Sequence, residues 1–267
     1  MLNQMKGVGD SNIPGIFVSK EAELEEKWKI HGIQAVYLTS QPEILRRIKQ
    51  LGGASIYLEE KNGTTCYEAD YIWQMSDGID FPDDIYIHRI WQRHMHLPWL
   101  IAETERLIIR ESVMEDLPYF QKFYEEERGN LDVQQLSEGE EQLRTYITTR
   151  YPYFEYGLWT IVDKATNTVI GRAGIEELPE NYGGLSGEPE LSYLFGKEYR
   201  GNGYAAEACQ AILNYSAEEL EMERIYLRTS QSNLPSQKLA EKLGLLKVES
   251  ITKYKDLLYC GLLTFER

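Results

Sequence analysis

Cysteine is scarce in this chain, which holds three among its 267 residues. Cys66, Cys209 and Cys260 are far apart, and no Cys-x-x-Cys pair occurs. An odd number of distant cysteines supports neither a disulfide framework nor a zinc site of the usual spacing. Thiols stay reduced in the cytoplasm, so we expect a cytoplasmic protein.

Histidine is similarly sparse, and the four histidines, His31, His88, His94 and His96, all precede position 100. His94-Met95-His96 is a candidate metal site, but no further cluster of ligands supports it. We therefore expect no metal.

Long apolar runs and excess positive charge are missing as well. No apolar run approaches the roughly 18 residues that span a membrane, and the N-terminal Met-Leu-Asn-Gln-Met-Lys-Gly has no signal-peptide core. The net charge of -15 repels phosphate backbones. We expect neither a membrane nor a nucleic-acid partner. An acidic surface suits a cationic partner, such as an amine or a basic protein tail, or only keeps the protein soluble.

The first hundred residues alternate between short apolar runs and a helical pattern. Residues 43–51 repeat apolar side chains along one helix face, with Pro42 before them and Gly52-Gly53 after them. This helix separates the expected strands 35–38 and 55–58, and a turn at Asn62-Gly63 precedes a third strand at 69–73. Strands joined by such a crossover pair in parallel. We predict a small Rossmann-like α/β domain over residues 1–100, with further helices at 20–29 and 85–96 and a linker near 97–104.

The pattern changes in residues 101–267, which we predict to be a second, mixed α/β domain. The order of its elements is β-α-α-β-β-β-α-β-α-β-β. The expected strands are 106–110, 158–162, 169–175, 190–195, 224–229, 246–251 and 257–264, and the expected helices are 113–127, 138–151, 204–220 and 235–243.

The sharpest local signal is the segment Arg200-Gly201-Asn202-Gly203-Tyr204-Ala205 between a strand and a helix. Two glycines permit a tight turn and a close approach of the backbone to a ligand. Ala205 and Ala206 leave the first N–H groups of the helix accessible, so they and the helix dipole form an anion site that the charge of Arg200 can assist. An ordinary turn is the alternative. The motifs Gly-x-Gly-x-x-Gly and Gly-Lys-Ser/Thr are absent, which excludes two other phosphate loops.

Three segments around this loop resemble the GNAT superfamily of N-acetyltransferases, in the family's order and spacing. They are the cofactor motif Arg200–Ala205, the fourth strand Glu190–Phe195, and the stretch Ser232–Leu245 with its Glu241-Lys242-Leu243-Gly244. The opening Thr104–Arg110 resembles the branch that includes ribosomal-protein N-terminal acetyltransferases. The resemblance covers about residues 104–265 and implies a mixed, splayed central sheet with flanking helices.

The resemblance also implies acetyl-CoA as cosubstrate. The amides of Gly201, Asn202, Gly203, Tyr204, Ala205 and Ala206 would hold its pyrophosphate. The backbone near Leu194 and Phe195 would pair with the pantetheine arm, where a bulge splays the fourth and fifth strands, and an N–H near Leu194 would polarise the thioester carbonyl. Asn233 would hold the cofactor or brace the strands, or else cap the next helix.

The chemistry requires a neutral amine, so a carboxylate base is expected in the slot. Glu190 lies on the strand that lines the slot, with Glu188 as second candidate; either is otherwise a solvated carboxylate. The tyrosine that donates a proton to the leaving thiolate in many relatives corresponds to about Ala240. Ser236, one turn earlier, is the remaining donor, or a packing serine.

These features predict transfer of acetyl to a primary amine, either a protein N-terminus or a small amine, by direct attack. A non-catalytic acyl-CoA-binding or sensing module is the alternative, suggested by the missing tyrosine. Residues 1–100 loosely resemble a haloacid-dehalogenase-like Rossmannoid unit without its Asp-x-Asp nucleophile. Such a remnant would serve docking to a partner protein, contact within a homodimer, or cover for the substrate. The acceptor, and whether Tyr182-Gly183-Gly184 forms a flap, stay open at this point.

Overall fold

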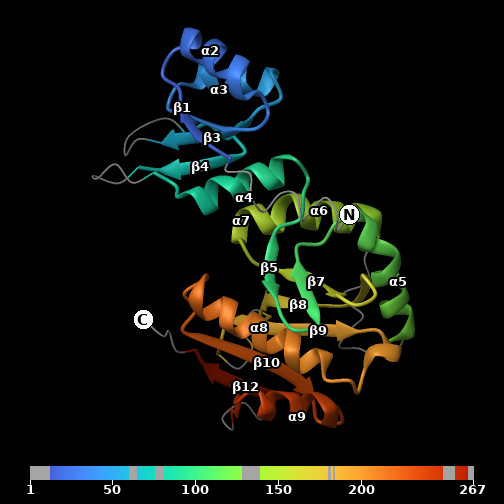
Figure 1. Cartoon of the computed structure of the whole chain (residues 1–267). Helices are drawn as coiled ribbons and strands as arrows, with labels where there is room; N and C mark the ends of the chain where they lie inside the picture. Colours follow the sequence, from blue (N-terminus) through green and yellow to red (C-terminus); the bar gives the residue numbers. More distant parts are fainter. Residues whose placement is uncertain are drawn as a thin grey trace. The chain divides into compact units, whose positions relative to one another are not determined.

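The computed structural model describes residues 13–59, 65–75, 81–127, 139–179, 182, 184–248 and 256–263. The chain forms two compact units, Met1–Trp99 and Leu100–Arg267, each with its own sheet (Figure 1). No helix in the described part of the chain is both long and apolar enough to cross a membrane. The turn predicted at Asn62-Gly63 and the middle residue of Tyr182-Gly183-Gly184 lie outside the described residues.

Unit 1, Met1–Trp99, contains a four-stranded parallel sheet whose strand order follows the chain. Its elements are β1 (Gly15–Phe17), α2 (Glu21–His31), β2 (Val36–Thr39), α3 (Pro42–Gln50), β3 (Ala54–Glu59), β4 (Tyr71–Gln74) and α4 (Asp84–His94). The parallel pairing confirms the predicted α/β unit. The likeness to the haloacid-dehalogenase fold stays a prediction.

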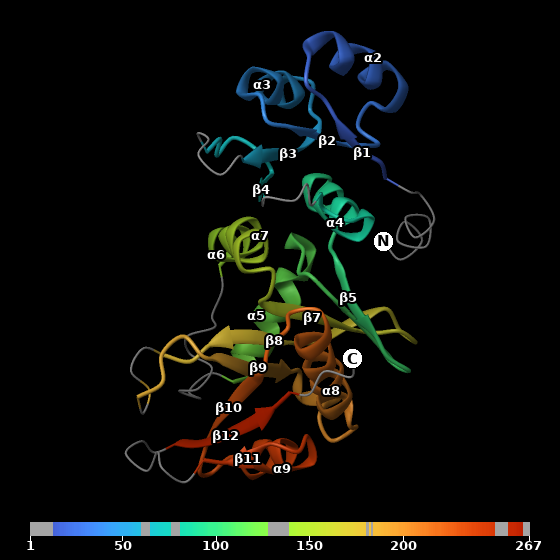
Figure 2. The ribbon, with the colours of Figure 1, turned by 90° about the vertical axis from the view of Figure 1, so that its left-hand side faces the viewer.

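Both faces of the unit 1 sheet are covered, which explains the uninterrupted apolar runs of its strands. Along β2, Val36 and Leu38 pack with Trp91 of α4, whereas Tyr37 packs with Ile48 of α3. Successive side chains of a strand point to opposite faces. Helix α4 therefore lies on one face, and α2 and α3 lie on the other (Figure 2).

Unit 2, Leu100–Arg267, contains an eight-stranded sheet in the order β11-β12-β10-β9-β8-β7-β6-β5. All neighbouring strands pair antiparallel except β9 and β10, which are parallel. The strands are β5 (Leu100–Glu103), β6 (Leu107–Arg110), β7 (Leu158–Asp163), β8 (Thr168–Glu177), β9 (Pro189–Phe195), β10 (Arg224–Ser230), β11 (Leu246–Lys247) and β12 (Asp256–Leu262).

Helices cover both faces of the unit 2 sheet. They are η1 (Met114–Asp116), α5 (Leu117–Glu126), α6 (Glu140–Thr145), the π-helical η3 (Tyr146–Arg150), α7 (Tyr151–Phe154), η4 (Lys197–Tyr199), α8 (Tyr204–Glu218) and α9 (Leu234–Lys242). On β7, the Trp159 ring meets the Tyr215 ring of α8, while the adjacent Thr160 bonds Asp116 of η1. The alternation places α8 and η1 on opposite faces. This mixed, two-sided architecture confirms the predicted fold class.

Several boundaries differ from the sequence prediction. The expected linker 97–104 contains strand β5, which pairs antiparallel with β6. The helix expected at 113–127 begins with the 3-10 turn η1, and α5 starts at Leu117 with Pro118 in its first turn. The helix expected at 138–151 widens into the π-helical turn η3 at Tyr146. Of the strand expected at 246–251, the described residues form only the short β11.

Candidate active site

The loop between η4 and α8 turns on two glycines. Gly201 has φ +79° and Gly203 has φ +81°, a left-handed conformation that side chains other than glycine rarely adopt. A Cβ atom added to Gly201 would meet no other atom within 4 Å. The loop is therefore tightly turned and open on its outer side, so a ligand can approach its backbone closely.

The first turn of α8 leaves its backbone donors accessible. The N–H groups of residues 201–206 make no hydrogen bond to another described residue, and no side chain caps the helix. Unbonded donors at a helix N-terminus carry partial positive charge and are suited to a phosphate. The residues present here fit the diphosphate of coenzyme A.

Arg106, which sequence reasoning did not identify, holds this loop in place from the start of β6. Its Nε donates to Glu207 in the first turn of α8 at 2.6 Å, and its Nη1 donates to the Asn202 carbonyl at 2.9 Å. Its guanidinium also lies 4.5 Å from the centre of the Tyr204 ring. Glu207 accepts two more bonds, from the Arg106 N–H and the Thr104 hydroxyl. The loop is thus braced against the first strands of the unit.

Arg200 is used differently from the expectation that it would assist a phosphate. Its Nε donates to the Phe195 carbonyl at 2.8 Å, and its Nη1 lies 2.8 Å from a Glu127 carboxylate oxygen. Both contacts direct the side chain back toward the end of β9 and the end of α5. Arg200 therefore anchors the loop, and the donors left open to a ligand there are the backbone amides.

Beside this loop the central sheet divides. Strands β9 and β10 share one residue pair, Glu190 with Tyr226, whereas β8 and β9 pair without interruption from Gly171–Phe195 to Glu177–Pro189. The predicted splay of the two parallel strands is therefore present. The predicted bulge is not, because the register of β9 against β8 shows no shift.

The orientation of β9 shows which backbone N–H near Leu194 faces the divided side of the sheet. The Gly196 N–H donates to the Ile170 carbonyl beyond the end of the β8–β9 ladder. Because successive backbone groups of a strand point to opposite edges, the Phe195 N–H faces away from β8, toward the divided side. The Leu194 N–H faces β8 instead. Of the two residues predicted to meet the pantetheine arm, Phe195 is the one that presents backbone donors and acceptors there.

Glu190 lies at the point where β9 and β10 part. The residue is buried, and its Oε1 is 3.2 Å from the Arg228 Nε on β10. Burial raises the Glu190 pKa to about 6, Arg228 opposes the rise, and the neighbouring Glu176 adds to it. A carboxylate whose pKa lies near neutrality is suited to accept a proton from an ammonium. Glu188, the second candidate, is partly exposed before β9.

Ser236 and Asn233 lie at the start of α9, near a tyrosine that sequence reasoning did not identify. The Tyr193 hydroxyl on β9 donates to the Ser236 Oγ at 2.8 Å. Burial raises the pKa of Tyr193 to about 12, so the phenol is protonated at neutral pH. The Asn233 Oδ1 accepts the Ser236 N–H at 3.2 Å, which is the capping role considered for this residue. Ala240, the position to which the expected tyrosine corresponds, is fully buried.

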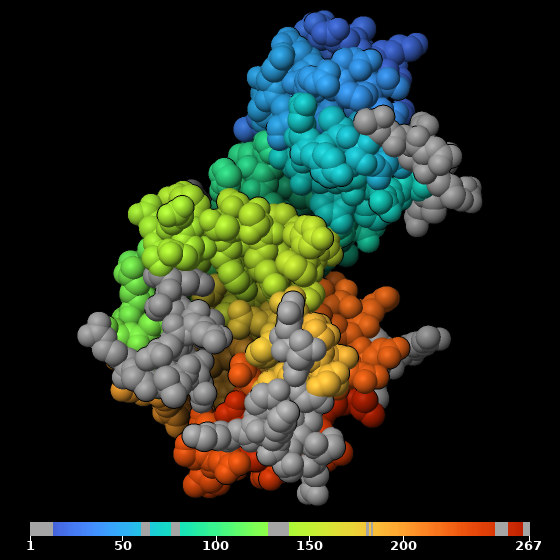
Figure 3. All heavy atoms as spheres, turned by 180° about the vertical axis from the view of Figure 1, so that it is seen from behind, coloured from blue at the N-terminus to red at the C-terminus, as the bar shows by residue number. Residues whose placement is uncertain are grey.

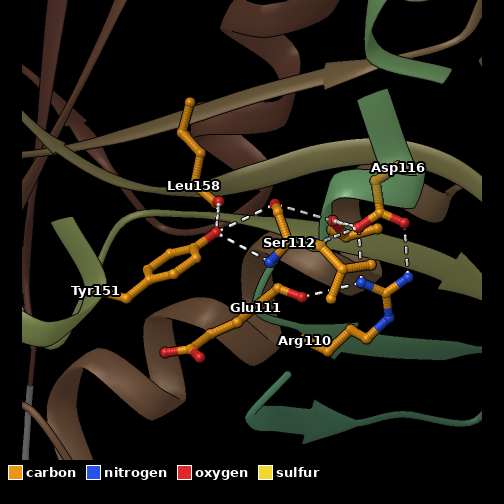
Figure 4. A network of polar contacts seen from close by, with 8 residues as sticks. Arg110, Glu111, Ser112, Asp116, Tyr151 and Leu158 are labelled. Carbon is orange, nitrogen blue, oxygen red and sulfur yellow. Dashed lines mark hydrogen bonds and ion pairs between the residues drawn. The ribbon is translucent and has the colours of Figure 1, made fainter. Parts of the chain in front are cut away.

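A buried polar network fixes η1 and α7 against β6 and β7 (Figure 4). Arg110 makes a two-pronged contact with Asp116, at 2.7 and 2.8 Å, and Thr160 donates to the same carboxylate at 2.8 Å. The Tyr151 hydroxyl of α7 accepts the Ser112 N–H and donates to the Leu158 carbonyl. Because buried polar groups are costly when unbonded, this saturated network specifies one arrangement of these helices.

An open hollow of about 1000 Å³ is lined by residues of α6, η3 and α7. These elements form the yellow-green surface in Figure 3. Among its lining residues, Arg150 pairs through both Nη atoms with Glu177 at the end of β8, at 2.9 and 2.8 Å. Tyr153 is largely exposed beside it. The hollow is thus connected to the end of β8 where Glu176 lies opposite Glu190.

Comparison with known proteins agrees with this architecture. The curated relatives include the uncharacterized N-acetyltransferases YjdG of Bacillus subtilis and p20 of Bacillus licheniformis. YjdG is 32% identical over 101 residues (38% of this chain, 58% of YjdG), and p20 is 30% identical over 97 residues (36% of this chain, 52% of p20). The chain thus spans about half the length of the curated relatives it matches.

A solved acetyltransferase from Agrobacterium tumefaciens str. C58 is 25% identical, with a TM-score of 0.50 over 60% of this chain and 92% of that one. The family model described as acetyltransferase (GNAT) domain matches residues 106–246. That match runs from Arg106 through the loop, the divided strands and α9, more than half of the sequence. The chain therefore belongs to the GNAT acetyltransferase family.

Proposed function

We propose that residues 101–267 transfer the acetyl group of acetyl-CoA to a primary amine by direct attack. The observation that carries the proposal is the row of unbonded amides at residues 201–206, beside strands β9 and β10 that share one residue pair. The amides suit the diphosphate, and the free edge of β9 suits an extended amide-containing arm. The family match supports the same activity.

In this proposal each group acts on one part of the reaction. Acetyl-CoA supplies the activated acyl group. Glu190 accepts a proton from the incoming ammonium, because its pKa of about 6 leaves it ionised yet basic at neutral pH. The Phe195 N–H stabilises the oxyanion. Ser236, hydrogen-bonded by Tyr193, donates a proton to the leaving thiolate and is reprotonated by the second proton that the acceptor nitrogen loses.

The carboxylates beside the opening between β9 and β10 favour a cationic amine as acceptor, either a protein N-terminus or a small amine. Glu176 and Glu190 face each other on neighbouring strands, and Glu188 precedes β9. The chain as a whole carries a net charge of -15, which attracts cations to such a site. The hollow over α6, η3 and α7 offers room for the remainder of the acceptor.

Unit 1 is proposed to recognise the acceptor or a partner protein without taking part in the chemistry. Removal of residues 1–99 should then reduce acceptor use and spare coenzyme affinity. Equal loss of both would indicate a purely structural role.

The test combines calorimetric titration of coenzyme A with a thiol-release assay against panels of amines and basic peptides. Binding followed by turnover on at least one amine is expected. Binding without turnover on any acceptor would favour the non-catalytic acyl-CoA module, and absence of binding would contradict both.

A further inference from the structure

The Glu190 carboxylate has a cationic neighbour on the strand from which β9 diverges. Two residues beyond the single β9–β10 pair at Tyr226, the Arg228 Nε donates to the Glu190 Oε1 at 3.2 Å. The exposed fraction of the Glu190 side chain is 8%, and that of Arg228 is 32%. The ion pair therefore spans the opening between the strands and is largely withdrawn from water.

The charges around this pair come from four adjacent strands. Glu176 on β8 is the cross-strand partner of Glu190, and Asp256 on β12 has its Oδ2 3.9 Å from the Arg228 Nη1. The Arg228 guanidinium also lies 5.5 Å from the centre of the Tyr182 ring. Arg228 thus lies among three carboxylates, which disfavour an acidic acceptor at this position.

Glu190 has opposing requirements as a base. It must lie away from water, and it must be ionised before the ammonium arrives. Burial and the like charge of Glu176 both favour the neutral acid, and Arg228 is the neighbour that favours the carboxylate. A hydrogen-bonded ion pair also fixes the carboxylate in one orientation, which a solvated glutamate would lack.

We propose that Arg228 is a positioning residue for acetyl transfer, which holds Glu190 through their ion pair so that the carboxylate stays oriented and able to accept a proton. The inference rests on the proposed function. In the step itself, an N–H bond of the substrate ammonium breaks and an O–H bond forms on Glu190. Arg228 keeps its own protons throughout. The freed amine attacks the acyl carbon, so that a C–N bond forms, the C–S bond of the thioester breaks and coenzyme A leaves as the thiolate.

The test compares the pH profiles of kcat/KM for the full chain and its variants. Arg228→Gln should shift the acid limb to higher pH by about one unit or more, since a cation this close lowers a carboxyl pKa by roughly 1–3 units. Arg228→Lys, which keeps the charge, should retain most of the wild-type profile. Arg224→Gln is the matched control, because it removes the same charge from an exposed position of the same strand. It should leave the limb in place.

Glu176→Gln should shift the acid limb of the kcat/KM profile in the opposite direction, to lower pH, because it removes a negative charge beside Glu190. An acid limb that stays fixed in Arg228→Gln, or that Arg224→Gln moves equally, would overturn the inference. Thermal unfolding of each variant shows whether a loss of activity reflects misfolding.

A second readout does not depend on turnover. The side-chain carboxyl of Glu190 can be titrated by carbon-13 NMR in the coenzyme-free protein, with Glu190→Gln to assign the signal. Its midpoint should rise in Arg228→Gln and remain near the wild-type value in Arg228→Lys. An unchanged midpoint would refute the role of Arg228 even if the enzyme is active, whereas a shifted midpoint in a chain that acetylates nothing would refute the proposed function instead.

Discussion

Two carboxylates, one in each unit, are paired with cations and yet differ in their chemistry. In unit 1, Asp70 accepts the Ser55 N–H and hydroxyl, both at 2.8 Å, and lies 3.3 Å from His94 Nδ1. Burial raises its pKa, but the bonds from His94 and Ser55 outweigh burial, so the net shift is downward. In unit 2, burial of Glu190 outweighs Arg228, and the net shift is upward. Asp70 is saturated with donors and serves structure, whereas Glu190 keeps capacity for a proton.

The contrast also bears on the metal site considered at His94. Its Nδ1 faces Asp70, and its Nε2 is 3.2 Å from the Gly52 carbonyl. Both ring nitrogens are therefore engaged in linking α4, β4 and the end of α3. Within the described residues no group of three or more metal-ligating side chains is found.

The largest expected effect separates these two carboxylates by activity. Glu190→Gln should lower kcat/KM by roughly 10²–10⁴-fold, the usual contribution of a general base. Asp70→Asn should change it less than about twofold, because a structural carboxylate takes no proton during the reaction. Steady-state kinetics at pH 7.5 measure both. Equal losses of kcat/KM in the two variants would contradict the different roles assigned to Glu190 and Asp70.

The next prediction concerns the stability that a fully hydrogen-bonded, buried carboxylate gives to the fold. Asp116→Ala removes the centre of the network in Figure 4 and leaves Arg110 buried without its partner. We expect a loss of about 3–5 kcal/mol in unfolding free energy, measured by urea denaturation. Glu140→Gln breaks the exposed ion pair with Arg144 and should cost at most about 0.5 kcal/mol. Similar losses of unfolding free energy in the two variants would show that the network does not hold η1 and α7 in place.

A third prediction addresses the unbonded backbone amides of residues 201–206, the proposed diphosphate site. Gly203→Val forces a β-branched residue into φ +81° and places side-chain atoms by the donors, so coenzyme A affinity should fall on the order of 100-fold. Gly244→Val is the control, because Gly244 has φ +77° and open space at the end of α9. Gly244→Val introduces the same backbone strain at a position away from the amides of residues 201–206. Calorimetric titration that found equal affinity losses would point to general strain.

The smallest effect is on stability as a function of pH. Glu190 has a folded pKa of about 6, above its ordinary value of 4.5, so the folded state holds the extra proton between these values. The stability it contributes is present below pH 4.5 and is lost as pH rises through about 6, in total roughly 2 kcal/mol. Asp70 has the opposite sign, because its lowered pKa gives stability that disappears on acidification. Urea midpoints of wild type and Glu190→Gln at pH 5, 6 and 7 should diverge steadily; parallel curves would contradict the raised pKa.

Much of the fold followed from local patterns. Apolar runs separated by a helix of crossover length predicted the parallel sheet of unit 1, and the Gly-x-Gly turn predicted the loop at Gly201 and Gly203. Strand β5 was not predicted, because four residues behind Pro98 with a terminal Glu103 resemble a linker until β6 pairs with them. Short edge strands depend on a partner more than on their own sequence.

The supporting residues of the site were less predictable, because their contacts join distant parts of the chain. Arg106 meets Glu207 across 101 positions, and Tyr193 meets Ser236 across 43. No spacing rule relates such pairs. The Tyr193 contact brings a phenol to Ser236 from β9, although Ala240 occupies the position expected for the tyrosine.

The bond between Arg106 and Glu207 has a consequence for how this fold can be divided. In the sequence, the glycine motif is one continuous segment. Its conformation, however, is supported by hydrogen bonds from Arg106, about a hundred residues earlier in the chain. A fragment that began after β6 would contain every glycine of the motif and lack the support that sets their spacing. The proposed coenzyme site is therefore a property of the assembled unit, which forms only when its first and middle segments have met.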